Sequence, residues 1–342
     1  MDLTPSTEQL EIIESSAAFL RDRWPITQTR EMFGAAANVD SGAWRAAAEV
    51  GWFGLGLPES MGGIGCGLAD EALLFREIGR SLSSGPMLSS VLGARVAAFG
   101  GHAELAGRII GGEERVGLVV PGSCDLVGPD GVVSGDVQLL DADGTLALIA
   151  TPESAVLVEV GALDDVVTVA CIDPAVRLRR AVANRVAPVV AVRVADDAIE
   201  RRGHVLAAAM LTGITEAVRD IASEHAKNRV QFNRPIGVNQ AIKHPCADMA
   251  VRAQLSLAQT LFAALTTDEG REDADFHALS AHLVAAEAAE FATAATVQIL
   301  GGIGYSFEHD AHLYVKRTHV MSRLFGGIAA QLTRLLGQPA PR

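Results

Sequence analysis

A β-rich segment lies between two helical regions in this chain, and this order restricts the fold more than any other feature of the sequence. From Val116 to about Val194, short runs of Val, Leu and Ile alternate with Pro, Gly and Asp turns, a pattern typical of strands. No helix-length pattern separates these runs, so a parallel sheet with crossover helices is not expected. The sequence therefore predicts three domains, which cover residues 1–115, 116–194 and 195–342.

The two flanking regions carry helical periodicity. The first begins with a capped amphipathic segment, and helical spacing returns at residues 43–50 and 69–78, on either side of a Gly-rich loop. The last region repeats apolar residues at helical spacing from Leu206 to Ile221. Three further candidate helices follow at Gln240–Thr266, Ala274–Leu300 and Glu308–Leu324. The predicted class is α+β, with an N-terminal helical domain, a small middle β domain and a C-terminal four-helix bundle.

The composition argues against several classes of partner and site. A net charge of −13 opposes binding to nucleic acid or to an anionic membrane. No run of about 18 apolar residues is present to span a bilayer, and the acidic N-terminus does not resemble a signal peptide. The four cysteines are scattered without a CxxC pair. These features predict a reduced, cytoplasmic protein without a metal site.

The stretch RVQFNRPIGVNQAIKHPCADM, residues 229–249, is the most informative motif in the chain. It joins two predicted helices, because Pro235 forbids continuation of the first and Gln240 opens the second. Asn233 tolerates the left-handed conformation that a tight turn requires. An arginine, Arg229, close to the free amides of a helix start is able to bind phosphate. An ordinary inter-helix loop with a surface arginine is the alternative.

Three motifs resemble those of the acyl-CoA dehydrogenase family. Residues 229–249 match its signature R-x-Q-F-G-x-P-I-x-x-x-Q-A-I-x-x-x-x-A-D-M, except that Asn233 replaces a turn Gly. VQILGGIGYSFEH at 297–309 is similar to Q-x-x-G-G-x-G-Y-x-x-E, and GLGLPESMGGIG at 54–65 is similar to L-P-E-x-x-G-G-x-G. The motifs occur in the family's order, and the helical–β–helical organisation agrees with its fold. The chain is thus identified as a divergent, short member of this family.

The resemblance implies a cofactor, a substrate and an oligomer. Members bind FAD where two subunits of a tetramer meet, oxidise an acyl-CoA thioester between Cα and Cβ, and pass electrons to an electron-transfer flavoprotein. One subunit supplies the acyl-CoA pocket and a Glu base, whereas its neighbour supplies groups around the pyrophosphate and adenosine. The residues of this chain that correspond to the neighbour's set are Arg229, Gln231, Phe232, Asn239, Gln240, Gln298, Gly301 and Gly302.

The other half of the family's site is poorly matched. Of the flavin-facing segments of the β domain, only Ser123 and Asp125 resemble the usual residues. The base position that most members use is occupied by Phe325, and the position that isovaleryl-type members use is occupied by Gly203. Neither residue is able to accept a proton. Glu200, one helical turn before Gly203, is the remaining candidate for the base.

These departures favour a subunit that has lost its own pocket. The chain resembles the degenerate subunit of actinobacterial heteromeric acyl-CoA dehydrogenases that act on bulky steroid-side-chain CoA thioesters. It would form an α2β2 heterotetramer and complete the FAD site of a homologous catalytic partner. Two alternatives stay open: a stand-alone acyl-CoA dehydrogenase whose base is displaced to a residue such as Glu200, and a flavin-free structural subunit.

Overall fold

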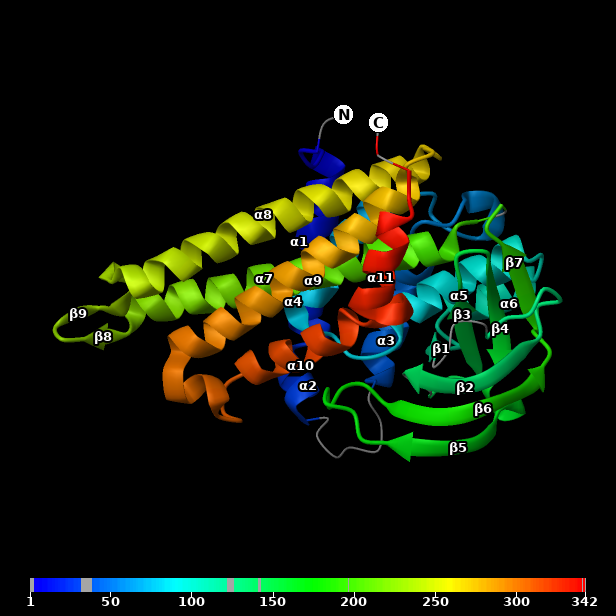
Figure 1. The fold of residues 1–342 in the computed structure, drawn as a ribbon, viewed down its shortest axis with the longest axis horizontal. Coiled ribbons are helices and arrows are strands. Elements are labelled where there is room, and N and C mark those ends of the chain that lie inside the picture. Colours follow the sequence, from blue (N-terminus) through cyan, green and yellow to red (C-terminus); the bar gives the residue numbers. More distant parts are fainter. Residues whose placement is uncertain are drawn as a thin grey trace.

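The computed structural model has a β sheet at one end and a bundle of long helices that extends away from it (Figure 1). The N-terminal helices lie along the bundle and against the sheet (Figure 1). The residues that the structure describes are 3–31, 39–121, 126–140, 143–195, 197–339 and 341.

The N-terminal region is helical up to the first strand. Its helices are α1 (Thr7–Arg23), α2 (Ile26–Glu31), α3 (Ser41–Glu49), α4 (Leu68–Ser81), α5 (Met87–Phe99) and α6 (Ala103–Ile110). The predicted cap of the first helix is confirmed, because the Ser6 hydroxyl accepts a hydrogen bond from the Gln9 amide and the Gln9 side chain accepts one from the Ser6 amide. The predicted Gly-rich loop separates α3 from α4.

The middle region forms one seven-stranded sheet with the order β5-β6-β2-β1-β3-β4-β7. The strands are β1 (Val116–Pro121), β2 (Val133–Leu140), β3 (Leu146–Ala150), β4 (Ser154–Glu159), β5 (Asp164–Val169), β6 (Leu178–Val186) and β7 (Val190–Arg193). All pairs in it are antiparallel except β1 with β3. The expectation that no parallel βαβ sheet forms is therefore confirmed.

Strand β6 was not expected from the sequence, although it is the longest strand of the sheet. Its segment LRRAVANRV contains three arginines, so it lacks the apolar run that marked the other strands. Its buried positions are Ala181, Ala183 and Val186, and the two alanines pair with Val137 and Gly135 of the neighbouring strand β2. Alternate burial of small residues therefore stabilises a strand that hydrophobicity alone does not reveal.

The C-terminal region contains three long helices followed by two short ones. These are α7 (Ile199–Asn228), α8 (Gln240–Asp268), α9 (Ala274–Leu300), α10 (Ala311–Met321) and α11 (Gly327–Leu336). A two-stranded hairpin, β8 (Val230–Gln231) and β9 (Arg234–Pro235), joins α7 to α8. The sequence predicted a single last helix at Glu308–Leu324, whereas the described residues form α10 there and α11 beyond it. The reason is a run of positive φ angles at Phe325 (56°), Gly326 (100°) and Gly327 (74°), which breaks the helix.

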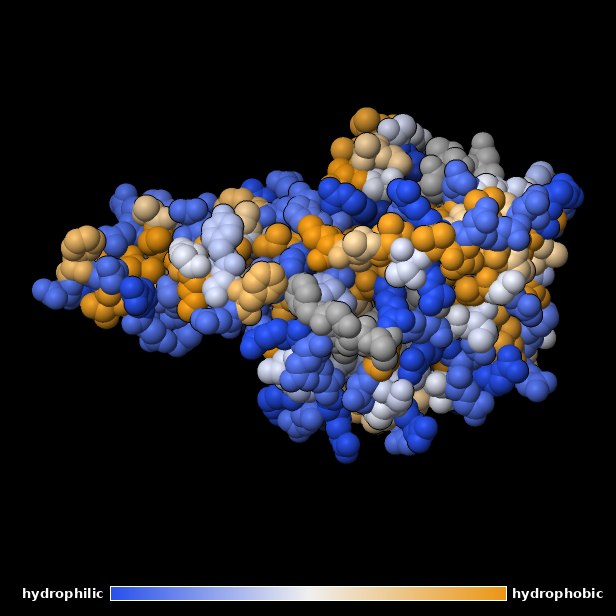
Figure 2. Space-filling model, turned by 90° about the horizontal axis from the view of Figure 1, so that it is seen from below, coloured by the Kyte–Doolittle hydropathy of each residue, from blue (hydrophilic) through white to orange (hydrophobic). Residues whose placement is uncertain are grey.

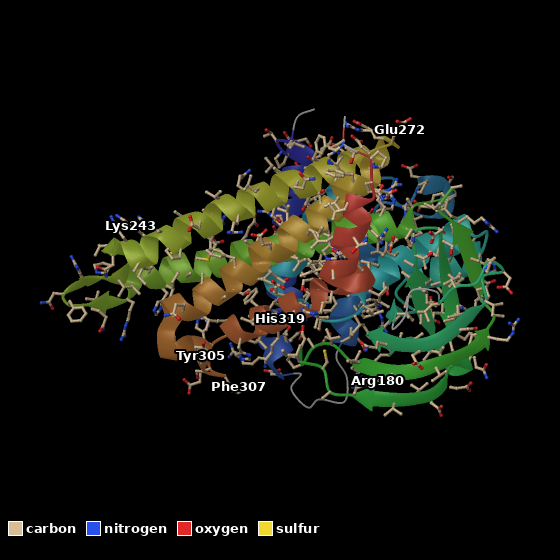
Figure 3. All side chains as sticks on the ribbon, viewed as in Figure 1. Arg180, Lys243, Glu272, Tyr305, Phe307 and His319 are labelled. Atoms are coloured by element: carbon tan, nitrogen blue, oxygen red, sulfur yellow. The ribbon has the colours of Figure 1, made fainter. Side chains whose placement is uncertain are left out.

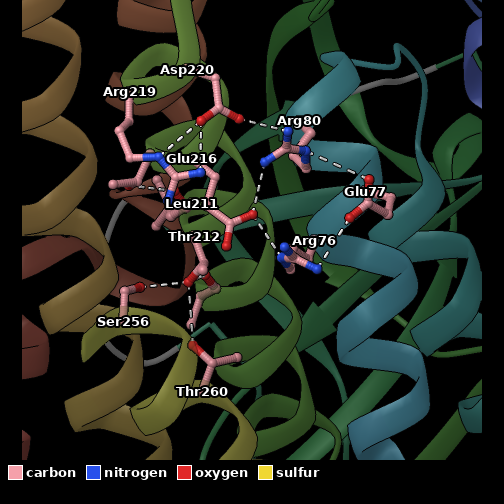
Figure 4. A network of polar contacts seen from close by, with 12 residues as sticks. Arg76, Glu77, Arg80, Leu211, Thr212, Glu216, Arg219, Asp220, Ser256 and Thr260 are labelled. Atoms are coloured by element: carbon pink, nitrogen blue, oxygen red, sulfur yellow. Dashed lines mark hydrogen bonds and ion pairs between the residues drawn. The ribbon is translucent and has the colours of Figure 1, made fainter. Parts of the chain in front are cut away.

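Helices α4 and α7 cross with their backbones in contact. A Cβ atom placed on Gly213 would lie 1.9 Å from the carbonyl oxygen of Arg76, and one on Gly79 would lie 2.1 Å from that of Met210. Ion pairs bridge the same two helices, because Arg76 and Arg80 both bond Glu216, at 2.7 and 3.0 Å (Figure 4). The crossing fixes the direction of α7. This helix carries the candidate site residue Gly203 near its start and leads to Arg229 at its end.

Helix α9 is long and apolar enough to cross a membrane by length and composition alone. Half of its most apolar window is buried inside the protein, and the helix packs against α7 and α8. A core helix of a helical bundle passes the same test, and the contacts of α9 are those of a core helix.

Candidate functional site

The two residues predicted to occupy the family's base positions lie against each other in this structure. Gly203 is in the second turn of α7, and Phe325 is in the short turn Leu324–Gly326 between α10 and α11. A Cβ atom on Gly203 would lie 2.4 Å from Cζ of Phe325. The phenyl ring therefore occupies the space that a side chain at position 203 would need, so Phe325 in this position requires a glycine at 203.

Phe325 adopts a backbone conformation that is unusual for a bulky residue. Its φ and ψ angles are 56° and 43°, in the left-handed region, which costs about 1–2 kcal/mol for a residue with a Cβ. The residue is buried, and its ring centroid lies 5.2 Å from that of His204. Packing against His204 and Gly203 offsets the backbone strain. An apolar ring thus fills the place where the resemblance predicts a carboxylate.

A buried cluster of two histidines and a glutamine lies next to the Phe325 ring. His282 Nε2 donates a hydrogen bond to the Met321 carbonyl at 3.1 Å, so its Nδ1 is free to accept. That Nδ1 lies 2.9 Å from Nδ1 of His204 and 3.2 Å from Nε2 of Gln331. Burial lowers the pKa of His282 to about 4, and burial together with the neighbouring His282 lowers the pKa of His204. Both rings are therefore neutral at pH 7.

Glu200, the remaining candidate for the base, is held in an ion pair. Its two carboxylate oxygens accept hydrogen bonds from Nη1 and Nη2 of Arg334, each at 2.8 Å. The side chain of Glu200 is 8% exposed, and burial raises its pKa whereas Arg334 acts in the opposite direction. A carboxylate whose two oxygens are both bound by one guanidinium must break that contact before it accepts a proton.

A pocket of about 1220 Å³ opens between the sheet and these residues. The turn Thr151–Ser154 and residues 127–131 form its sheet side, and Glu200, Phe325 and Arg334 form its helical side. A second, apolar cavity nearby, between α5, α7 and Leu324, measures only about 30 Å³. That volume holds about one water molecule and is far too small for an acyl chain.

The charges of the large pocket do not fit FAD. Its lining carries the carboxylates of Asp130, Glu153 and Glu200 against the guanidinium groups of Arg193 and Arg334. Arg334 is already bound to Glu200, so the pyrophosphate would face an excess of negative charge. The two residues of the β segment that resemble the family's flavin-facing residues, Ser123 and Asp125, lie outside the described residues.

The residues predicted to contact FAD lie at the opposite end of α7. Gly203 and Arg229 are about 40 Å apart along the helix, at about 1.5 Å per residue. Arg229 follows the last residue of α7 and Gln240 is the first residue of α8, as predicted, and Asn239 occupies the N-cap position of α8 without a side-chain hydrogen bond to it. The base positions and the predicted flavin set therefore cannot act on the same ligand within one chain.

The hairpin at this end presents its side chains to solvent. Phe232 is 95% exposed, and it forms the tight turn with Asn233 at positive φ angles of 52° and 62°. Gln231 is also exposed, and no ion pair of Arg229 occurs within the described residues. An exposed phenylalanine in a left-handed conformation is unfavourable in an isolated chain.

The end of α9 reaches the same part of the molecule (Figure 1). Gln298 is in its last turn, and a Cβ on Gly301 or Gly302 would meet no atom within 4 Å. Tyr305 and Phe307 follow, 79% and 68% exposed, and lie on the α10 side of this end (Figure 3). Figure 2 shows apolar side chains among hydrophilic ones over this narrow end of the molecule.

Comparison with family models defines the class of protein. The description "Acyl-CoA dehydrogenase, C-terminal domain" matches residues 201–337, and "Acyl-CoA dehydrogenase, N-terminal domain" matches residues 6–109. Together these matches cover most of the chain and include the three motifs, whereas the whole β region at residues 116–194 lies outside both matches. The chain belongs to the acyl-CoA dehydrogenase family.

Individual relatives and solved structures agree with this family. The chain is 32% identical to acyl-CoA dehydrogenase IpdE2 of Mycobacterium tuberculosis, over 97% of this chain and 98% of that protein. In the crystal structure of the ChsE4-ChsE5 complex from Mycobacterium tuberculosis, a chain superposes with a TM-score of 0.87 at 22% identity, covering 99% of this chain and 100% of that one. A chain of the Tcur3481-Tcur3483 steroid ACAD G363A variant superposes with a TM-score of 0.84 at 22% identity, with 98% of each chain covered. The predicted fold, with helical, β and helical regions, is confirmed.

The contact between Gly203 and Phe325 predicts a measurable coupling. Gly203→Ala should lower the free energy of unfolding by about 1–3 kcal/mol, because the added methyl group overlaps the phenyl ring. Phe325→Ala removes that overlap, so the double variant should be more stable than the sum of the single effects, by about 0.5–3 kcal/mol. Urea denaturation of the four proteins gives this coupling energy. The control combines Gly203→Ala with Leu332→Ala, on the outer face of α11, and the changes in the free energy of unfolding of these two variants should add. Additive changes for the 203/325 pair would contradict the contact.

Proposed function

We propose that the chain is a subunit of an FAD-dependent acyl-CoA dehydrogenase that completes the FAD site of a catalytic partner. The observation that carries this proposal is the separation of the two half-sites along α7. At one end, Phe325 fills the base position and the pocket is acidic. At the other end, Arg229 and the glycines after α9 are exposed and able to reach a ligand held by another chain.

Each exposed group has a chemical role in this proposal. The Arg229 guanidinium would pair with phosphate oxygens of the partner's FAD. Gly301 and Gly302 would let the backbone approach the cofactor closely, because a Cβ is absent from both. The exposed Phe232 ring would be buried against the partner, which explains the strained turn that presents it. FAD accepts a hydride from the substrate when bound, and the carboxylate base would come from the partner's own pocket.

The comparisons support the assembly and the substrate class of this proposal. The superposed structures are a ChsE4-ChsE5 complex and a Tcur3481-Tcur3483 steroid ACAD, so two-chain members of this fold exist. We therefore propose an α2β2 heterotetramer with a homologous acyl-CoA dehydrogenase subunit. Its reaction would be the α,β-dehydrogenation of an acyl-CoA thioester, with a bulky steroid side chain as the acyl group and an electron-transfer flavoprotein as the acceptor.

Each of the two alternative functions disagrees with a feature of the site. A stand-alone enzyme with Glu200 as its base would have to release that carboxylate from both of its hydrogen bonds to Arg334. A flavin-free structural subunit would leave the exposed Arg229 and Phe232 without a role. Both alternatives are separated from the proposal by one measurement of flavin content.

The test is to record the flavin spectrum of the purified chain and of the chain co-purified with the product of an adjacent dehydrogenase-like gene. Flavin only in the mixed complex, at about one per two chains, is the expected result. Flavin in the chain alone, bleached by acyl-CoA, would support the stand-alone enzyme instead. Absence of flavin from both preparations would support the structural subunit.

Removal of the Arg229 charge gives a narrower prediction. In the mixed complex, Arg229→Ala should raise the dissociation constant for FAD about 10- to 100-fold, because a charge-assisted hydrogen bond to phosphate is worth about 1.5–3 kcal/mol. Flavin retained after gel filtration measures the effect. Arg108→Ala is the matched control, since it removes the same charge from the exposed face of α6 near the sheet. Equal flavin retention in both variants would show that Arg229 does not contact the cofactor.

A further inference from the structure

Helix α11 packs against α9 with Ile328 and Leu335 half-buried, and the side chains that fix it most closely to the rest of the protein are polar. Gln331 is its only buried residue among those described, whereas Leu332 and Leu336 are 46% and 86% exposed. Gln331 donates hydrogen bonds to the Leu324 carbonyl at 2.9 Å and to His282 Nδ1 at 3.2 Å. The bidentate ion pair between Arg334 and Glu200 is the second attachment. A helix of ten residues is marginal in water without such contacts.

The segment that connects α11 to α10 has the geometry of a hinge. Three consecutive residues, Phe325, Gly326 and Gly327, have positive φ angles. The two glycines rotate without a steric penalty, whereas Phe325 is strained in its present conformation. Rotation at the hinge would relieve that strain, so the polar attachments of α11 must offset it in the observed state.

One face of α11 forms a wall of the large pocket. Gly326, Ala330 and Arg334 recur every four residues and all line the pocket, together with Phe325. The Glu200–Arg334 pair also lines a smaller cavity of about 90 Å³, which shares Thr151, Pro152 and Ser154 with the large pocket. A movement of α11 would therefore change both cavities and withdraw the Phe325 ring from Gly203.

We propose that α11 is a hinged cover of the pocket and that the Glu200–Arg334 ion pair is its latch. In the closed state the latch holds α11 against α7 and keeps Phe325 in the base position. In the open state α11 turns about residues 325–327, and the pocket becomes accessible from the side of α7. Glu200 thus acts as a positioning residue for α11. This inference is independent of the proposed function, because it concerns contacts within one chain.

Chymotrypsin provides a direct test, because it cleaves after phenylalanine and Phe325 is buried only while α11 is closed. In the full-length chain, Arg334→Gln should increase the rate of cleavage between Phe325 and Gly326 about tenfold or more, since a charge-assisted contact is lost. Glu200→Gln should act in the same way. Hydrogen exchange of residues 328–336 should rise in parallel, while exchange in α8 stays unchanged.

Two controls separate a latch from a general stabilising contact. Leu332→Ala, on the exposed face of the same helix, should leave the cleavage rate unchanged. The charge-exchanged double variant Glu200→Arg/Arg334→Glu should restore most of the protection that either single variant loses. Unchanged cleavage in both single variants would overturn the proposal. An equal rise of exchange in α8 and α11 would also overturn it, because the ion pair would then stabilise the whole fold.

Discussion

Replacing Gly213 with alanine should destabilise the chain so strongly that little folded protein is recovered. The added methyl group would lie 1.9 Å from the Arg76 carbonyl oxygen, which belongs to the backbone of α4 and cannot rotate away. Overpacking a rigid contact costs about 1–3 kcal/mol and occasionally more, and here two helices must separate along their crossing. We expect a loss of about 3 kcal/mol or more from a total stability of about 5–15 kcal/mol.

The yield of soluble protein and the urea midpoint measure this effect. Gly107→Ala is the matched control, since Gly107 also lies within a helix but a Cβ there would meet no atom within 4 Å. That variant should gain up to about 1 kcal/mol from helix propensity. If Gly213→Ala were as stable as Gly107→Ala, α4 and α7 would not cross as closely as described.

Arg317→Met should cost about 3–5 kcal/mol of stability, because it removes the ion pair of a buried carboxylate. Arg317 on α10 donates to Asp173 in the segment between β5 and β6, and to the Ser83 carbonyl after α4, the latter at 3.0 Å. The side chains of Arg317 and Asp173 are 4% and 2% exposed. One guanidinium therefore joins the N-terminal, middle and C-terminal regions.

The unfolding transition in urea should show this loss as a lower midpoint. Arg323→Met, which removes an exposed arginine two residues after the end of α10, should change the midpoint little. The double variant Arg317→Met/Asp173→Asn should be more stable than Arg317→Met alone, because no buried charge then lacks a partner. A single variant as stable as the double variant would show that the pair contributes no specific interaction.

Much of the helical architecture could be predicted because its signals are local. Gln240 and Ala274 begin α8 and α9 as predicted, and both helices end within two residues of the predicted bounds, because apolar periodicity and caps lie within each segment. Strand β6 was missed because its inward residues are alanines between arginines. Helix α11 was missed because a Gly pair normally ends a helix, and nothing local indicates that another begins at once.

The candidate site was predictable in its parts but not in its arrangement. Motif spacing located Phe325 and Gly203 separately, whereas their contact depends on how α10 returns along the bundle to α7. Arg334 and His282 were not identified at all, because each pairs with a residue of α7 that is far away in the sequence. Such long-range polar pairs leave no periodic signal in the sequence.

The length of α7 has a consequence for how this chain tolerates change. Residues about 40 Å apart on one rigid helix share no partners, so substitutions at its two ends should have additive effects on stability and binding. A chain built in this way is able to lose the chemistry of one end while the other end continues to serve a neighbour. Division of labour between two related chains then requires no new fold, only substitutions such as Phe325 and Gly203 at one end of a shared helix.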